Sequence, residues 1–368
     1  MKKTLKIALS VVFILAIVFS SLVFVFADTE SVFEEDAYAT VVTASDFQDY
    51  DSKAFIRFGN ILGLMKNEGM AQPCSMLSAG DYSRFLPDYA TSGVVQLKNA
   101  MTGVYPEMDE DTILCIQGNH DIKSAGFIPT GFSDMGSYCI YAINENDFPW
   151  DQYLTNGSKV KKTAKDVEEK LNAMIEAEDF RPVIIITHVP LHHTRRSGGG
   201  DNQYASYLFD VINKAAEKLD IIFLFGHNHS DDYDDYIGGS VNFIAKGETI
   251  RIPYADKRSQ TEYKEETLNF TYTNAGYVGY SGNGTENGST NVLTVGAIQF
   301  TKDSFHLVKY AESGVIATYD VDRINVDDSD TIGGISAAKI PVINNSFLYE
   351  LAKKIINFLL SIFKTFPI

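Results

Sequence analysis

Apolar and polar positions follow two patterns along the chain, one typical of strands and one typical of helices. Short runs rich in β-branched residues predict strands in the first part of the chain, at 40–44, 74–79, 112–116, 138–143, 183–187 and 221–225. Between these runs, apolar residues recur at spacings of three and four, as in 167–175 and 208–215, and this spacing predicts amphipathic helices. Strands that alternate with helices predict a layered α/β fold.

The pattern changes after residue 240. Strand-like runs continue without convincing helices, at 269–273, 291–300, 304–310 and 315–320. Polar or glycine-rich turns separate them, so we expect this half to supply a mostly antiparallel sheet. Near the end of the chain, residues 346–366 carry the periodic apolar face of an amphipathic helix.

The N-terminus has the pattern of an export segment. Lys2, Lys3 and Lys6 precede an almost unbroken apolar run over 7–27. The run is also long enough to span a bilayer, so a cleaved signal peptide and a retained anchor both stay open. In either case the lysines stay inside and the body of the protein is extracytoplasmic, secreted or anchored at the cell surface.

The charge of the chain narrows the classes of partner. The formal net charge is −17, which repels nucleic-acid polymers and anionic membranes. Small phosphate compounds are compatible with it, because bound cations can invert the field inside one cleft. The three cysteines lie in apolar runs, where we expect buried free thiols, with one disulfide left open.

Side chains that bind metals follow the predicted strands of the first half. They are Asp46, Asp81, Asn119 with His120, His188, and His227 with His229. The carboxyl ends of such strands form ligand crevices, so residues distant in sequence can converge there. Oxygen and imidazole donors without thiolate suit Mn, Fe or Zn, and a carboxylate such as Asp81 can bridge two ions. Glycines precede three of these groups, Gly80, Gly118 and Gly226, and we expect them to allow sharp turns.

The ordered motifs resemble those of the calcineurin-like metallophosphoesterase superfamily. They are the segments 46–48 (Asp-Phe-Gln), 80–81 (Gly-Asp), 118–121 (Gly-Asn-His-Asp), His188 and 226–229 (Gly-His-Asn-His), and the match runs from about residue 41 to 310. The resemblance implies a four-layer α/β/β/α sandwich of two mixed sheets, with a dinuclear metal site at the carboxyl ends of the strands. It also implies hydrolysis of phosphate mono- or diesters by attack of a metal-bridging hydroxide.

The resemblance assigns roles residue by residue. It implies that one ion is held by Asp46, Gln48, Asp81 and His229, and the other by Asp81, Asn119, His188 and His227. The ions would be divalent or trivalent, with Mn, Fe or Zn favoured. His120 would not bind metal, but would contact the phosphate and assist the leaving oxygen.

Gln48 departs from the pattern, because the family usually has histidine there. Its amide oxygen can ligate a hard cation weakly, or hydrogen-bond a metal-bound water instead. This substitution motivates an alternative function, a surface-attached binding protein with weakened or lost turnover on the same scaffold. His192 is a candidate for the rim of the cleft, where it would touch phosphate, with a place in a surface loop left open. Arg195 is a candidate for recognising a second phosphate or a carboxylate.

The chain thus divides into five parts. They are 1–27 (signal peptide or N-terminal anchor), 28–38 (linker), 39–312 (metallophosphoesterase catalytic domain), 313–345 (strand and linker extension) and 346–368 (C-terminal amphipathic helix). The expected partner is a small phosphate ester, with no nucleic-acid polymer. For the last helix, membrane-surface contact, packing onto the body and self-association all remain open.

Overall fold

The structure is a computed structural model that describes nine stretches of the chain. They are residues 31–48, 53–82, 87–121, 126–149, 157–192, 204–227, 243–254, 262–279 and 293–324. The chain divides into two compact units, Met1–Val32 and Phe33–Ile368, and nearly all described residues belong to the second.

The first six-stranded sheet has the order β14-β13-β12-β1-β2-β3. Its parallel part consists of β1 (Ala39–Ala44), β2 (Ser75–Ser78) and β3 (Ile113–Cys115). Its antiparallel part consists of β12 (Val295–Phe300), β13 (Ser304–Ala311) and β14 (Gly314–Asp322). The two parts are joined where β12 pairs antiparallel with β1. The sheet is therefore mixed, and its centre combines the first and last described parts of the chain.

The second six-stranded sheet has the order β4-β5-β6-β7-β11-β8. Four strands run parallel in it, β5 (Cys139–Ile143), β6 (Val183–Thr187), β7 (Ile221–Phe225) and β11 (Thr271–Asn274). Antiparallel strands form both edges, β4 (Gly131–Asp134) and β8 (Phe243–Ile244). A separate hairpin-like pair is formed by β9 (Thr249–Tyr254) and β10 (Glu262–Thr267).

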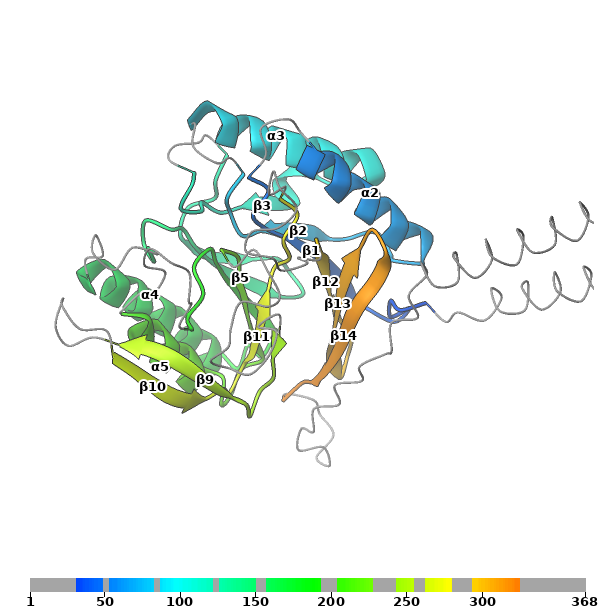
Figure 1. The fold of residues 1–368 in the computed structure, drawn as a ribbon. Helices are drawn as coiled ribbons and strands as arrows, with labels where there is room; N and C mark the ends of the chain where they lie inside the picture. The colour runs from blue at the N-terminus through cyan, green and yellow to red at the C-terminus, as the bar shows by residue number, and fades with distance from the viewer. Residues whose placement is uncertain are drawn as a thin grey trace, which may run out of the picture. The chain divides into compact units, whose positions relative to one another are not determined.

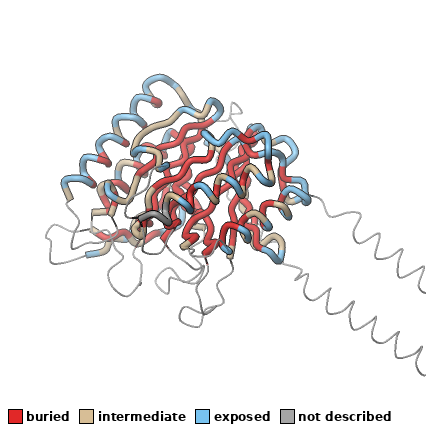
Figure 2. Tube along the Cα trace, turned by 90° about the horizontal axis from the view of Figure 1, so that it is seen from above, coloured by how far each residue is buried: buried red, intermediate tan, exposed pale blue. Residues whose placement is uncertain are grey.

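Helices cover the outer faces of the two sheets (Figure 1). One side carries α2 (Lys53–Asn67) and α3 (Pro87–Val104), and the other carries α4 (Gly157–Glu176) and α5 (Ala205–Ala215); a single 3-10 turn, η1 (Glu110–Thr112), leads into β3. One apolar core lies between the sheets and another between the second sheet and its helices. Figure 2 shows the consequence, with buried strands in the interior and exposed positions along the helices. The expected four-layer α/β/β/α sandwich of two mixed sheets is confirmed.

Sequence patterns located most of the first half correctly. β6 and β7 have the predicted bounds, and the helical patterns at 167–175 and 208–215 lie within α4 and α5. The second half pairs mostly antiparallel, as expected, in β12 to β14, in β9 with β10 and in β8 with β11. Its strands are shared among three sheets, however, and β11 also pairs parallel to β7. β4, β8, β9 and β10 were not predicted.

Some expectations at the edges of the domain also need correction or fall outside the described residues. Cys74 is exposed, whereas Cys115 and Cys139 are buried, and all three are free thiols. β14 lies in the segment 313–345, where a strand was expected, and it pairs with β13 in the first sheet. The segments 1–27 and 346–368 lie outside the described residues. Within the described residues, no helix is long and apolar enough to cross a membrane.

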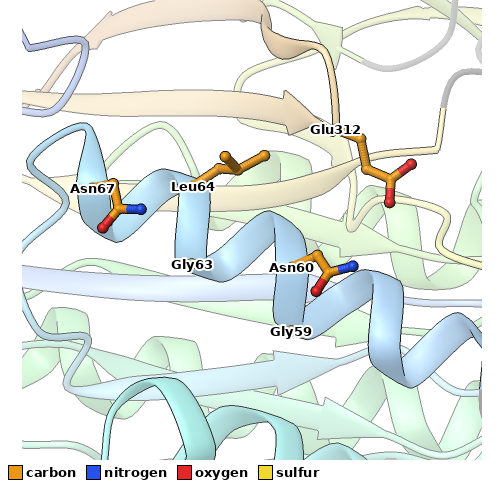
Figure 3. Close-up of a pocket in the computed structure, with 6 residues that line it drawn as sticks. All are labelled: Gly59, Asn60, Gly63, Leu64, Asn67 and Glu312. Atoms are coloured by element: carbon orange, nitrogen blue, oxygen red, sulfur yellow. The ribbon is translucent and has the colours of Figure 1, made fainter.

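A shallow hollow of about 460 Å³ opens beside α2 (Figure 3). Gly59, Asn60, Gly63, Leu64 and Asn67 line it from the helix, and Glu312 lines it from the turn between β13 and β14. Among the described residues, none of the metal-binding candidates borders this hollow.

Candidate metal centre

The candidate ligands sit on turns with unusual backbone geometry. Among the described residues other than glycine, five have positive φ, and four of them are Asp46, Gln48, Asp81 and His227. Positive φ costs free energy for residues with a Cβ, and such outliers cluster at functional sites where surrounding contacts fix them. The chain therefore holds these four side chains in orientations that a regular strand or helix would not give.

Asp46 is fully buried two residues after β1. Its Oδ2 accepts hydrogen bonds from the Ser45 hydroxyl at 2.6 Å and from the backbone N–H of His227 at 2.8 Å. One carboxylate oxygen thus fastens the turn after β1 to the turn after β7, which brings two sheets together at this edge.

Asp81 is fully buried three residues after β2. Its Oδ1 accepts the backbone N–H of His120 at 2.9 Å, and its Oδ2 accepts the side-chain amide of Gln48 at 2.9 Å. The same Oδ2 lies 3.4 Å from Nε2 of His188. Asp81 is therefore the central member of the group and contacts residues from three different turns.

A single amide links two histidines. Oδ1 of Asn119 lies 2.8 Å from Nε2 of His188 and 2.9 Å from Nδ1 of His227. The other ring nitrogen of His188, Nδ1, lies 2.6 Å from the carbonyl oxygen of Ala79, which can only accept a hydrogen bond. Nδ1 therefore carries a proton, and in the neutral ring the Nε2 lone pair faces the cluster, as a metal ligand requires.

These donors fit a metal centre. Ligand atoms of Asp46, Asp81 and His188 all lie within 4.8 Å of one another, and all three side chains are buried. The set consists of carboxylate oxygens, an amide oxygen and imidazole nitrogens, without a thiolate, which suits Mn, Fe or Zn. The structure thus brings together five of the predicted ligands, Asp46, Asp81, Asn119, His188 and His227.

The ionisable side chains of this group shift each other's pKa values. Burial alone would raise the pKa of Asp81, but the charge and hydrogen bond of His188 and the hydrogen bond from His120 lower it overall. Burial works to lower the pKa of His188, yet its interactions with Asp81 raise it to about 9. Metal ligation needs the neutral imidazole, so metal binding would release the His188 proton.

Two glycines are required because backbone and side chains approach each other closely. A Cβ at Gly118 would lie 2.2 Å from Oδ1 of Asp81, and a Cβ at Gly226 would lie 2.1 Å from the Ser45 hydroxyl. Neither glycine has positive φ, whereas Gly80 does, at 99°. The expected role in sharp turning therefore applies to Gly80, while the other two make room for the ligands.

His120 and Gln48 lie at the margin of the cluster. Nε2 of His120 is 4.0 Å from Oδ2 of Asp81, and its side chain is 21% exposed. It is thus reachable from solvent, whereas the Asp81 side chain is not. The amide nitrogen of Gln48 faces Asp81 and orients its carboxylate, so the metal-ligand role of Gln48 stays a prediction.

The remaining site predictions have different outcomes. His192 is buried, and its Nδ1 lies 2.8 Å from the hydroxyl of Tyr272, so its ring is fixed against the second sheet. Its predicted contact with phosphate stays a prediction. His229 and Arg195 lie outside the described residues, and their predicted roles stay predictions as well.

Sequence reasoning gave Asp121 no role, although it supports the centre. It is buried, and it accepts backbone N–H bonds from Asp81 at 2.7 Å, Gly118 at 2.9 Å and Tyr82 at 3.0 Å. Burial and the nearby charge of Asp81 raise the pKa of Asp121 above its usual range, while the backbone N–H bonds from Gly118 and Asp81 favour its charged form. Its place directly after the Gly-Asn-His segment was the only available signal.

A second supporting feature is the loop after β11. The N–H of Val278 donates to the carbonyl of Ser45 at 3.3 Å, and the guanidinium of Arg57 donates to the carbonyl of Val278 at 2.8 Å. A Cβ at Gly279 would lie 2.3 Å from the carbonyl oxygen of Asp46. The loop thus packs directly on the turn that carries Asp46 and Gln48.

No protein-family model and no curated protein sequence matches the chain. Solved structures do show some likeness. GAP50, described as the anchor in the inner membrane complex of Plasmodium, has a TM-score of 0.46 and 11% identity, covering 78% of this chain and 90% of its own. A dimetal phosphatase from Danio rerio has a TM-score of 0.42 and 9% identity, covering 77% and 99%. A putative 5'-nucleotidase from Staphylococcus aureus has a TM-score of 0.34 and 10% identity, covering 86% and 58%.

TM-scores below 0.5 are too low to support an argument, so the resemblance has to rest on the chain's own features. Two mixed sheets lie between two pairs of helices, and turns after β1, β2, β3, β6 and β7 bring the motif residues together. The chain therefore has the sandwich architecture and the clustered donors that its resemblance to the calcineurin-like metallophosphoesterase superfamily implies.

Proposed function

We propose that this protein is an exported, metal-dependent phosphoesterase that hydrolyses phosphate mono- or diesters of small compounds. The observation that carries the proposal is the buried convergence of Asp46, Asp81 and His188, with Asn119 hydrogen-bonded to His188 and His227. Two bound cations, Mn, Fe or Zn by their donor set, would activate water and polarise phosphoryl oxygens. Metal chemistry also reconciles an acidic protein with an anionic substrate.

The side chains around the metal site would have different roles in the reaction. Asp81 contacts groups from both sides of the cluster, so it is the residue suited to serve two cations at once. His120 is partly exposed and next to Asp81, so it can reach a bound ester and give a proton to the leaving oxygen. Asp121 holds the Asp81 turn through backbone hydrogen bonds and acts as a positioning residue.

Export is supported by the sequence alone. Three lysines followed by the apolar run 7–27 are typical of a signal peptide or an anchor. The proposed location is therefore extracytoplasmic, either secreted or attached at the cell surface. Fractionation of cells that express the full chain, with protease added from outside, would test this location directly.

The central experiment measures metal and turnover together. The full chain is assayed for bound transition metal and for hydrolysis of a chromogenic phosphate monoester and diester. Asp81→Ala and His227→Ala should lose metal and at least about a hundredfold in rate, because each removes a side chain proposed to hold the metal directly. Lys165→Ala, an exposed change on α4, is the matched control and should behave as wild type. Absence of transition metal, or full activity in both site variants, contradicts the proposal.

Gln48 supports one second candidate, a surface-attached binding protein with weakened or lost turnover. The supporting observation is that its amide hydrogen-bonds Asp81. If this candidate is correct, the wild type lacks turnover and Gln48→His creates it. Turnover by the wild type would reject the binding-protein function and keep the phosphoesterase.

A further inference from the structure

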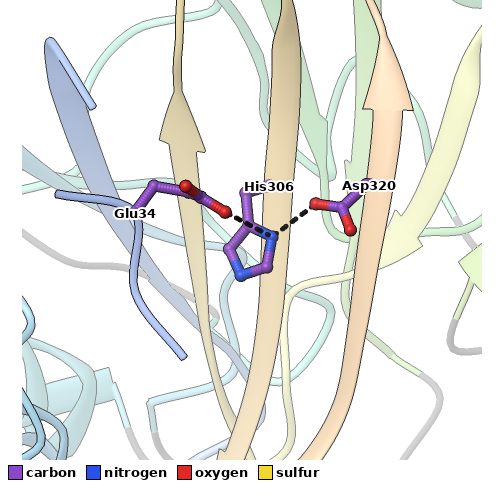
Figure 4. Close-up of side chains that lie close together, drawn as sticks. All are labelled: Glu34, His306 and Asp320. Carbon is purple, nitrogen blue, oxygen red and sulfur yellow. Dashed lines mark hydrogen bonds and ion pairs between the residues drawn. The ribbon is translucent and has the colours of Figure 1, made fainter. Parts of the chain in front are cut away.

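A second group of ligand-type side chains lies on the first sheet. It is separate from the candidate metal centre around Asp46, Asp81 and His188, called the strand-end cluster below. His306 on β13 pairs in register with Asp320 on β14, and on its other side with Gln299 on β12. Gln299 in turn pairs with Thr40 on β1, so this row crosses the strand near its beginning, whereas Asp46 follows its end. Glu34 reaches the row from the segment that precedes β1 (Figure 4).

Three donor atoms converge in this group. Nδ1 of His306 lies 2.6 Å from Oδ1 of Asp320 and 3.8 Å from Oε1 of Glu34. One ligand atom from each of the three residues lies within 4.8 Å of the other two. The His306 side chain is 8% exposed, while the two carboxylates are 46% and 44% exposed, so water can reach the group from one side.

One proton can join only two of these three groups. An N–H on Nδ1 points along one direction, and the 2.6 Å distance assigns it to Asp320, which leaves the Glu34 carboxylate beyond hydrogen-bond distance. A divalent cation that takes the place of this proton would attract both carboxylates and the Nδ1 lone pair simultaneously. One imidazole and two carboxylates are ligands that zinc accepts, and water can complete its coordination.

Glu34 is held in place by its backbone. Its N–H donates to Oε1 of Gln299 at 2.9 Å, and its carbonyl accepts from Nε2 of Gln299 at 3.3 Å. Phe33 is buried and stacks on Tyr310 of β13, with ring centroids 6.4 Å apart. The carboxylate is therefore presented to His306 by an ordered segment rather than by a freely moving tail.

We propose that Glu34, His306 and Asp320 form a site for a divalent cation, zinc by its donor set, that fastens residues 33–38 to the β13–β14 pair. The cation joins the segment that leads into the domain to an edge of its sheet. This site is independent of the phosphoesterase assignment, because it shares no residue with the strand-end cluster.

Zinc counting tests the site. Full-length protein is stripped with a chelator and dialysed against zinc, and bound zinc per chain is measured by mass spectrometry. Wild type should bind about one ion more than His306→Ala or Asp320→Asn, and Asp36→Asn, an exposed acid of the same segment, should match wild type. The difference should persist when Asp81→Ala removes a ligand of the other cluster. Equal zinc in wild type and both site variants overturns the proposal.

Limited proteolysis gives a second readout that does not depend on counting. Glu35 is exposed beside the site, so a glutamate-specific serine protease can cut after it. Zinc should slow this cleavage several-fold in wild type and in Asp81→Ala, but not in Asp320→Asn. Thermal melts of the stripped proteins show whether Asp320→Asn is folded. Equal cleavage of wild type with and without zinc overturns the proposal.

Discussion

A single methyl group at Gly118 should disable the metal centre. A Cβ there would lie 2.2 Å from Oδ1 of Asp81, 2.5 Å from its backbone nitrogen and 2.9 Å from its Cγ. Carbon–oxygen contacts below 3.0 Å essentially never occur, so the carboxylate must move by roughly 1 Å. That movement would break the 2.9 Å hydrogen bond from His120 to Asp81.

The size of the effect follows from these contacts. Overpacking at such a site costs about 1–3 kcal/mol of unfolding free energy. Metal sites tolerate ligand shifts of only about 0.2 Å, so we expect metal affinity to fall at least about tenfold. Gly118→Ala should therefore lose both stability and bound metal, with phosphoesterase activity lost in proportion to the metal.

Gly63→Ala provides the matched control. Gly63 lies within α2, and a Cβ there meets nothing within 4 Å, so alanine should raise helix stability by about 0.5–1 kcal/mol. Urea denaturation and metal titration of both variants separate the two effects. If Gly118→Ala binds metal as tightly as wild type and unfolds like Gly63→Ala, the proposed close packing of Gly118 against Asp81 is wrong.

Three further predictions address other parts of the structure. Asp121→Asn keeps the side-chain shape but replaces one acceptor oxygen by an NH₂ donor that faces backbone N–H groups. Metal affinity should therefore fall about 10- to 100-fold in a titration, and unchanged affinity would show that Asp121 does not position the metal ligands. A thiol reagent at pH 8 should label the exposed Cys74 and spare Cys115 and Cys139, because burial raises the pKa of these two thiols to about 12 and about 11. Mass spectrometry of the labelled peptides checks this, and labelling of Cys115 or Cys139 before Cys74 would contradict it. Protein in chelator should have an unfolding free energy about 2.7 kcal/mol lower than protein with free metal at a hundred times its Kd. Thermal melts measure this difference, and equal melting temperatures in both conditions would contradict a metal site in the folded state.

The strands and the order of the site motifs could be predicted from sequence because local patterns encode them. β6 and β7 are continuous apolar runs bounded by polar residues, and the residues after them, His188 and His227, stand where a strand ends. The short strand β4 and the strand β10 could not be predicted, because they have weak apolar patterns and depend on neighbouring strands. β9 was also missed, although its Ile250 and Ile252 are buried in the core.

Sequence therefore determined which residues are metal-type donors, that strand ends present them, and that the chain is acidic with an export-like N-terminus. Tertiary structure decided which donors meet. Burial of Asp46, Asp81 and His188 at one edge, the anchoring of the Asp81 turn by Asp121, and the insertion of β11 beside β7 all depend on contacts between residues far apart in sequence. Such contacts leave no local pattern, because each one is selected by the packing of two sheets rather than by the segment that contains it.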